Sequence, residues 1–322
     1  MSFIKGPWFR LIISAGLMFV LLGFMVDLKE AGRALAEARW GYLGWLALWI
    51  TLDRLLMAYK WRVLVICRGL EISFWQTIRA YYLSTFAGCF LPSTVGGDAM
   101  RVACVSNHSR PLSVLTASVA LERTLGFVAS AMAAALALSL LAGMAVDTPY
   151  GLVGWSLGIL LASVLAVGLT LSKRPARWMA ALPEKLAKKG RVLGWVGKLL
   201  AAYSEYRNHP LALAWFLFLS IIEQSVPVVG TWLTALAFNI DLSLLESAAV
   251  APLALLFTRI PVSVSGFGVV EGLYVAFFGL VGLTATDSFI LGLIANLSIV
   301  VTTLPGALFY AVGGLKGRGS GV

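Results

Sequence analysis

Apolar runs long enough to cross a lipid bilayer recur along this chain, and they restrict its fold more than any other feature. A membrane-spanning helix needs roughly 20 apolar residues. The candidate spans are residues 10–27, 40–58, 113–143, 151–172, 211–238 and 286–313. Of the 322 residues, 60% are hydrophobic and 12% are charged, which is more apolar surface than a soluble fold can bury. The sequence therefore predicts an all-α polytopic membrane protein with six full transmembrane helices.

Basic residues predict which ends of the spans face the cytoplasm, because Lys and Arg are concentrated in cytoplasmic loops. The loops without Lys or Arg are residues 144–150, 239–246 and 281–288. The segments expected inside are both termini and residues 59–76, 101–112 and 173–207. We therefore expect a multi-pass protein of the bacterial inner (cytoplasmic) membrane with cytoplasmic N- and C-termini. The first apolar run lacks a small-residue cleavage site, so we expect it to remain as a span.

The segment 173–207 is the most basic part of the chain. It contains nine Lys or Arg and two Glu, which gives it a net charge of +7. Such a segment favours an amphipathic helix that lies on anionic lipid headgroups. A membrane surface is therefore the expected partner of this segment, and no nucleic-acid partner is expected.

Two apolar pieces are too short to cross and are interrupted by proline and glycine. The first, residues 77–108, contains "LPSTVGGD" and has basic sequence at its end. The second, residues 247–282, contains "IPVSVSGFG" and lies between loops without basic residues. We therefore predict two re-entrant helical hairpins, the first entering from the inside and the second from the outside.

The two hairpins resemble each other in sequence. Each turn has an aliphatic residue, a proline, serine, valine and two glycines, followed by Asp98 in the first and Glu271 in the second. Residues 1–146 read as helix, helix, hairpin and helix. Residues 147–322 repeat that order, with the basic loop 173–210 after their first helix. The opposite orientations predict an inverted-topology repeat, a plan common among transporters. A chance similarity of two Gly/Pro turns is the alternative.

The turns are the first candidates for a binding site. Non-helical backbone at membrane depth is tolerated where it is buried in protein or lines a water-filled cavity. The helix that restarts after such a turn presents free N–H groups to an anion. The candidate residues of the turns are Gly96, Gly97, Asp98, Ser263, Ser265, Gly266, Gly268 and Glu271. In the alternative interpretation, the two carboxylates only cap these helix starts.

Further charges lie within or beside the apolar segments. Arginine suits bidentate contact with phosphate, so Arg101, Arg123 and Arg259 are candidate ligands for a lipid phosphate. Glu122, Glu223 and Asp98 are candidates to carry a proton or to bind a headgroup amine. The alternative is that these charges pair with one another as structural ion pairs. No catalytic constellation, metal site or cofactor is expected.

Four blocks carry a resemblance to a known family, and together they cover most of the chain: "YKWRVLV", "FLPSTVGGDAMR", "SVALERTLGF" and "IPVSVSGFGVVEG". The sequence resembles the lysylphosphatidylglycerol synthase transmembrane (flippase-like) family, the membrane domain of multiple peptide resistance factor proteins and of stand-alone relatives. The resemblance implies a domain with re-entrant hairpins that moves a polar lipid between leaflets, which is aminoacylated phosphatidylglycerol in the full-length relatives. No soluble aminoacyl-transferase domain follows "GGLKGRGSGV", so synthesis of that lipid is not expected.

The expected function is that of a lipid flippase or transporter. A phospholipid or lipid-linked substrate would place its headgroup in a central charged cavity between the hairpins while its acyl chains stay in the bilayer. Two alternatives stay open. The protein is a membrane enzyme that transfers a headgroup or sugar on a lipid substrate, or it is a non-transporting membrane partner of a separate synthase.

Overall fold

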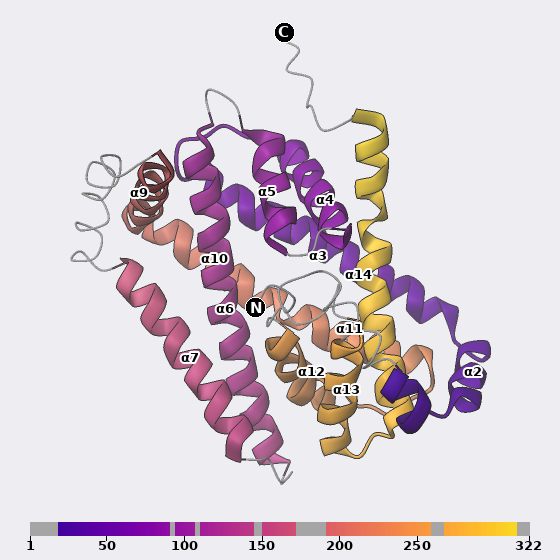
Figure 1. The fold of residues 1–322 in the computed structure, drawn as a ribbon. Coiled ribbons are helices and arrows are strands. Elements are labelled where there is room, and N and C mark those ends of the chain that lie inside the picture. Colours follow the sequence, from indigo (N-terminus) through magenta and orange to yellow (C-terminus); the bar gives the residue numbers. More distant parts are fainter. Residues whose placement is uncertain are drawn as a thin grey trace. The chain divides into compact units, whose positions relative to one another are not determined.

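The structure, a computed structural model, describes residues 19–90, 94–106, 110–144, 150–171, 191–258 and 267–313. All regular structure in these ranges is helical, and no strand forms in them (Figure 1). The α-helices are α2 (Leu28–Ala36), α3 (Trp40–Ile66), α4 (Phe74–Phe90), α5 (Thr94–Val105), α6 (Leu112–Gly143), α7 (Tyr150–Leu171), α9 (Arg191–Ser204), α10 (Pro210–Glu223), α11 (Ser225–Ala237), α12 (Leu244–Thr258), α13 (Val269–Phe278) and α14 (Ala285–Gly313). Short π- and 3-10 helices are η2 (Leu21–Met25), η3 (Glu205–Asn208) and η4 (Gly279–Val281).

The long helices follow the predicted spans. Helices α6, α7 and α14 begin and end within a residue of their predictions. Among the described residues, three segments are long and apolar enough to cross a membrane: Leu112–Gly143, Pro210–Ala237 and Ala285–Ala311. The predicted span 10–27 lies mostly outside the described residues.

Helix α3 continues well beyond residue 58, where its apolar run was expected to end. The charges that seemed to mark its end are accommodated inside the protein, because the side chains of Asp53 and Lys60 are buried. A charge on a membrane helix can face the interior of a bundle, so it does not always mark a helix end.

The predicted span 211–238 consists of two helices. Pro210 opens α10, a position that proline favours because the first helical N–H has no partner in the helix. Helix α10 ends at Glu223, and α11 starts at Ser225 after a turn at Gln224. Pro227 lies in the first turn of α11, where its missing N–H leaves no helical hydrogen bond unmade. The interruption places Glu223 at a helix end within an apolar segment.

The chain divides into two compact units, each discontinuous in sequence. The first-hairpin unit comprises Arg54–Ala129, Gly158–Glu223 and the described residues from Thr303 onwards, and it contains α4 and α5. The second-hairpin unit comprises the described residues up to Asp53, Ser130–Leu157 and Gln224–Thr302, and it contains α12 and α13. This division by contacts is distinct from the repeats 1–146 and 147–322, which stay a prediction.

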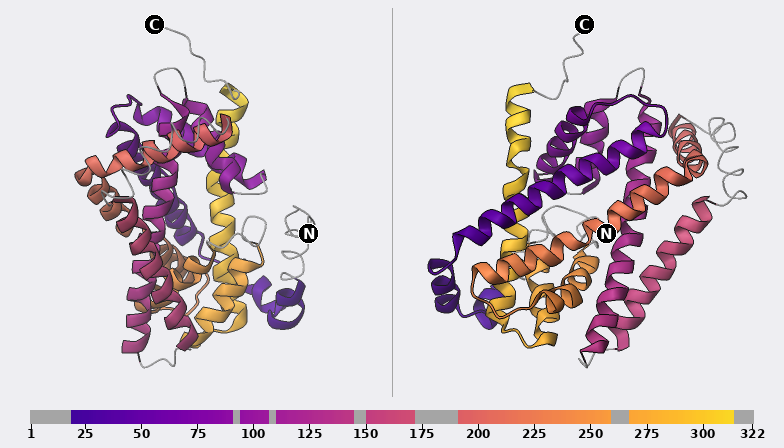
Figure 2. Two further views of the ribbon diagram at one scale, coloured as in Figure 1. Left: turned by 60° about the vertical axis from the view of Figure 1, so that its left-hand side comes forward. Right: turned by 180° about the vertical axis from the view of Figure 1, so that it is seen from behind.

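In the first-hairpin unit, α4 and α5 pack side by side (Figures 1 and 2). Helix α4 starts with a capping box, in which Gln76 N–H donates to Ser73 Oγ (3.1 Å) and Ser73 N–H donates to Gln76 Oε1 (3.2 Å). Gly97 of α5 faces α4 so closely that a Cβ atom would lie 2.7 Å from Ser84 O. The absence of a side chain at Gly97 therefore permits this helix pairing.

In the second-hairpin unit, α12 and α13 are neighbours. Helix α12 also starts with a capping box, in which Glu246 N–H donates to Ser243 Oγ (3.1 Å) and Ser243 N–H donates to Glu246 Oε2 (2.7 Å). Gly268 precedes α13 with a φ of 79°, a conformation that favours glycine. A Cβ on Gly292 of α14 would lie 2.9 Å from Glu271 Cα, so α13 and α14 also pack through a glycine.

Candidate functional site

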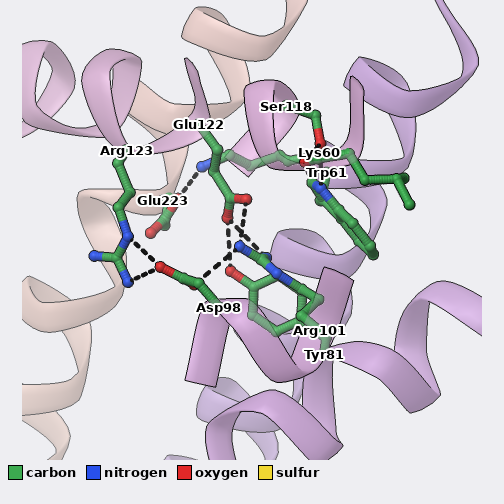
Figure 3. Close-up of polar contacts among 10 residues, drawn as sticks. Lys60, Trp61, Tyr81, Asp98, Arg101, Ser118, Glu122, Arg123 and Glu223 are labelled. Atoms are coloured by element: carbon green, nitrogen blue, oxygen red, sulfur yellow. Dashed lines mark hydrogen bonds and ion pairs between the residues drawn. The ribbon is translucent and has the colours of Figure 1, made fainter. Parts of the chain in front are cut away.

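The first-hairpin unit contains a group of charged side chains, which we call the charged cluster (Figure 3). Its members come from helices α3, α5, α6 and α10. The cluster consists of Lys60, Asp98, Arg101, Glu122, Arg123 and Glu223.

Arg101 lies at the centre of the cluster, and its side chain is only 3% exposed. Its Nη1 donates a hydrogen bond to Glu122 Oε1 (3.2 Å), and its Nη2 lies 2.9 Å from Glu122 Oε2. The same Nη2 donates to Asp98 Oδ1 (3.2 Å). Two partly buried carboxylates therefore compensate one buried guanidinium, as a charge removed from water requires.

The guanidinium of Arg101 makes cation–π contacts with two aromatic rings. The guanidinium carbon lies 4.8 Å from the centre of the Trp61 ring and 4.6 Å from that of Tyr81. Trp61 Nε1 donates to Ser118 Oγ (2.9 Å), and the Tyr81 hydroxyl donates to Glu122 Oε1 (2.8 Å). Because the rings are themselves fixed, Arg101 has little freedom to leave this position.

Arg123 differs from Arg101 in its exposure. It forms an ion pair with Asp98 Oδ2, yet 44% of its side chain is exposed, whereas the side chain of Asp98 is 16% exposed. Asp98 therefore joins the two arginines, with Oδ1 on Arg101 and Oδ2 on Arg123 (Figure 3). Arg123 is therefore the more exposed of the two guanidiniums that contact Asp98.

Beside these residues, the buried Lys60 forms an ion pair with the partly buried Glu223 (Figure 3). The Lys60 ammonium also lies 4.8 Å from the centre of the Phe216 ring. Glu223 is the last residue of α10, so this pair joins α3 to the end of α10. With this pair, the cluster has three basic and three acidic side chains, so its formal charge is zero.

In the second-hairpin unit, Glu271 is fully buried and is held by neutral donors. Gly268 N–H donates to Glu271 Oε2 (2.7 Å), and Asn296 Nδ2 donates to Glu271 Oε1 (3.2 Å). The first bond satisfies an N–H at the start of α13, so Glu271 acts as a helix cap. The candidate residues Arg259, Ser263, Ser265 and Gly266 lie outside the described residues.

The first turn differs from its predicted form. Because α5 begins at Thr94, Gly96, Gly97 and Asp98 are helical residues rather than part of the turn. Capping was one interpretation for both carboxylates. The structure gives that role to Glu271, whereas Asp98 bonds to arginine side chains.

The structure brings together Asp98, Arg101, Glu122 and Arg123, which the sequence had singled out from separate segments. Lys60, Trp61 and Tyr81 were not among the residues expected at this site. The signal for the first two was present in the block "YKWRVLV". A lysine and a tryptophan one residue apart in a helix cannot be assigned to a site until its neighbours are known.

The profile of a family described as the lysylphosphatidylglycerol synthase TM region matches residues 8–306, which is most of the chain. No curated protein and no solved structure matches the chain.

Proposed function

The chain belongs to the family of the lysylphosphatidylglycerol synthase TM region, and from that premise we propose that it is a lipid flippase or transporter. It is a multi-pass, all-helical membrane protein. We propose that it moves a phosphate-bearing lipid between the leaflets of a bacterial inner membrane, with both termini in the cytoplasm. The observation that carries this proposal is the exposed guanidinium of Arg123, paired with Asp98 in a cluster otherwise largely buried.

Charged groups within membrane proteins are costly, and they commonly mark substrate or ion pathways. A cluster with zero formal charge and one exposed guanidinium suits a lipid phosphate, because the site is stable when empty and still offers a cation. We propose Arg123, assisted by Gly96, Gly97, Asp98 and Arg101, as the phosphate site. Glu122 and Glu223 are proposed partners for a proton or a headgroup amine.

Element lengths support the proposed re-entrant hairpins. Helices α4, α5, α12 and α13 have 17, 12, 15 and 10 residues, which is shorter than a full span. Each pair belongs wholly to one compact unit, whereas α3, α6, α7 and α14 each contribute residues to both. This difference is expected if the long helices cross the bilayer and the hairpins do not. With the predicted span 10–27 and the α10–α11 segment, the proposal has six full spans.

The helix starts support the proposed inverted repeat of residues 1–146 and 147–322. Both hairpins open with a serine capping box, at Ser73 and Ser243. In both, a buried aliphatic residue precedes the serine, Ile72 in the first and Leu242 in the second. On this plan, we propose Gly268 and Glu271, together with Arg259, Ser263, Ser265 and Gly266, as the lipid-contacting residues of the second hairpin.

The test is lipid movement in reconstituted vesicles. Purified protein is incorporated into phosphatidylcholine vesicles that contain a trace of phosphatidylglycerol with a fluorescent acyl chain, and a membrane-impermeant reductant bleaches the outer leaflet. We expect the wild-type protein to make the inner-leaflet label accessible. Arg123→Ala should lower this rate by about tenfold or more, because a charge-assisted contact with phosphate is lost. Lys198→Ala, at an exposed position of α9, is the matched control for a lost positive charge.

Wild-type movement no faster than that of Arg123→Ala and Glu271→Ala would count against a flippase. Formation of a modified lipid from a lipid donor by the purified protein would favour the membrane enzyme. If neutral substitution of Arg101 and Glu271 left folding and cellular phenotype unchanged, the non-transporting partner would be favoured.

A further inference from the structure

The two arginines that share Asp98 are unequal. Arg101 is buried, lies between two aromatic rings and has Glu122 as a second carboxylate partner. Arg123 is 44% exposed and lies one helical position beyond Glu122 on α6. One of the two guanidiniums is thus fixed within the protein, and the other faces outward with Asp98 against it.

Asp98 occupies the place on Arg123 that an anionic ligand would take. Carboxylate and phosphate oxygens both accept charge-assisted hydrogen bonds from guanidinium N–H groups. Here Asp98 Oδ2 accepts from Arg123 Nε and is paired with Nη2 of the same guanidinium. Because Arg123 presents the contact that a phosphate oxygen needs, Asp98 and a phosphate compete for it.

We propose that Asp98 is a built-in competitor for the lipid phosphate, and that binding exchanges the Asp98–Arg123 pair for a phosphate–Arg123 pair. This inference rests on the proposed phosphate site at Arg123. In the exchange, Asp98 keeps its bond to Arg101, which is already present through Oδ1. The displaced carboxylate therefore remains compensated, and its burial imposes no unpaired charge.

The exchange makes the site selective against weak anions. A ligand must bind Arg123 more strongly than Asp98 does before it can be retained, and a phosphate with several acceptor oxygens meets that condition better than a single carboxylate. It also means that Asp98→Asn, although it removes a residue of the site, should raise the affinity for the lipid. An amide competes for a guanidinium less well than a carboxylate, so the variant should bind the lipid more tightly.

The experiment measures binding rather than transport. Detergent-solubilised protein is titrated with dioleoylphosphatidylglycerol, with dioleoylglycerol as the lipid without phosphate, and with glycerol 3-phosphate as the phosphate without acyl chains. Native mass spectrometry counts bound molecules and gives apparent dissociation constants. Size-exclusion profiles and thermal unfolding establish that each variant is folded, and Asp98→Ala replaces Asp98→Asn if the amide variant aggregates.

We expect Asp98→Asn to bind phosphatidylglycerol about fivefold more tightly, the factor that corresponds to releasing one partly exposed ion pair. Arg123→Gln should weaken binding about tenfold or more, and the double variant should equal Arg123→Gln, because the gain requires the guanidinium of Arg123. Glu205→Gln, which removes a carboxylate from the separate ion pair with Arg68, should bind as the wild type does.

Weaker or unchanged binding by Asp98→Asn overturns the exchange, as does a gain that persists without Arg123. Equal binding of dioleoylglycerol overturns phosphate recognition. If glycerol 3-phosphate shows the same gain, the exchange holds with free phosphate as its ligand. If the binding experiment confirms the exchange but the vesicles show no lipid movement, the lipid site stands and the flippase proposal is wrong. If the vesicles show lipid movement but the binding experiment does not show the exchange, the flippase proposal stands and the exchange is wrong.

Discussion

The two hairpins hold their carboxylates in different ways. Asp98 bonds to two guanidiniums and lies within a cluster of six charges, whereas the two donors of Glu271 are a backbone N–H and the amide of Asn296. Helical lengths and capping boxes are alike in the two, yet their electrostatics are not. The comparison indicates that two hairpins of similar helix length can place a carboxylate among charged partners in one case and among neutral donors in the other.

The largest effect is expected when the buried cation of the first hairpin is removed. Arg101→Ala leaves Glu122 and Asp98 without their shared partner, and breaking a buried pair costs about 3–5 kcal/mol. Asn296→Ala in the second-hairpin unit removes one neutral donor and should cost about 1–3 kcal/mol. Thermal unfolding in one detergent compares the two variants. If the two variants lowered the unfolding temperature equally, ionic partners in the first hairpin and neutral donors in the second would contribute equally to stability.

A second prediction tests what the hairpins share, which is close packing on glycines of α14. A Cβ on Gly306 would collide with Tyr82 O of α4, and one on Gly292 would meet Glu271 Cα of α13. Overpacking costs about 1–3 kcal/mol, so Gly306→Ala and Gly292→Ala should both lower the unfolding temperature.

Gly158→Ala on α7 is the matched control, because a Cβ there would meet nothing within 4 Å. A helical Gly→Ala change at such a position should be neutral or stabilise slightly. If only one of the two α14 variants has a lowered unfolding temperature, the hairpins differ in packing as well as in charge.

Part of this arrangement was predictable from the sequence. The limits of α6 and α14 were predicted within one residue, because hydropathy and proline or polar boundaries are local properties of the chain. Whereas the re-entrant insertion of the two hairpins stays a prediction, the segments that form the helix pairs α4–α5 and α12–α13 were located for the same reason. The start of α5 was not, because "TVGGD" has the composition of a turn and becomes helical where Gly97 packs against α4.

The charged cluster was predictable as a set of residue types but not as a geometry. Arg101 and Arg123 were taken together as phosphate ligands, and the structure separates them by burial. The ring of Tyr81 that distinguishes them comes from α4, and Lys60 pairs with a residue 163 positions away. Contacts at such separations depend on tertiary packing and leave no periodic signal in the sequence.

A third prediction asks whether the charge of Glu271 matters for stability. Glu271→Ala leaves Gly268 N–H and the Asn296 amide without their acceptor and should cost about 1–3 kcal/mol, the usual range for buried donors left unsatisfied. Glu271→Gln keeps an oxygen that can accept from Gly268 N–H, and the Asn296 amide can turn to accept from the new NH₂ group. The glutamine variant should therefore recover most of the lost unfolding temperature. A glutamine variant no more stable than the alanine variant would show that the second hairpin needs a charge too.

The smallest effect is expected at the ion pair between Arg68 and Glu205, which lies outside the charged cluster. The Glu205 side chain is 57% exposed, and Arg68 also lies 5.1 Å from the centre of the Tyr206 ring. An exposed pair contributes about 0–1 kcal/mol, so Glu205→Gln should change the unfolding temperature little, and less still in high salt. The same measurement on Glu122→Gln, whose carboxylate contacts Arg101, should give a larger loss that salt hardly alters. If both variants lowered the unfolding temperature by the same amount and with the same dependence on salt, burial would not make the ion pairs of the charged cluster more stabilising than an exposed pair.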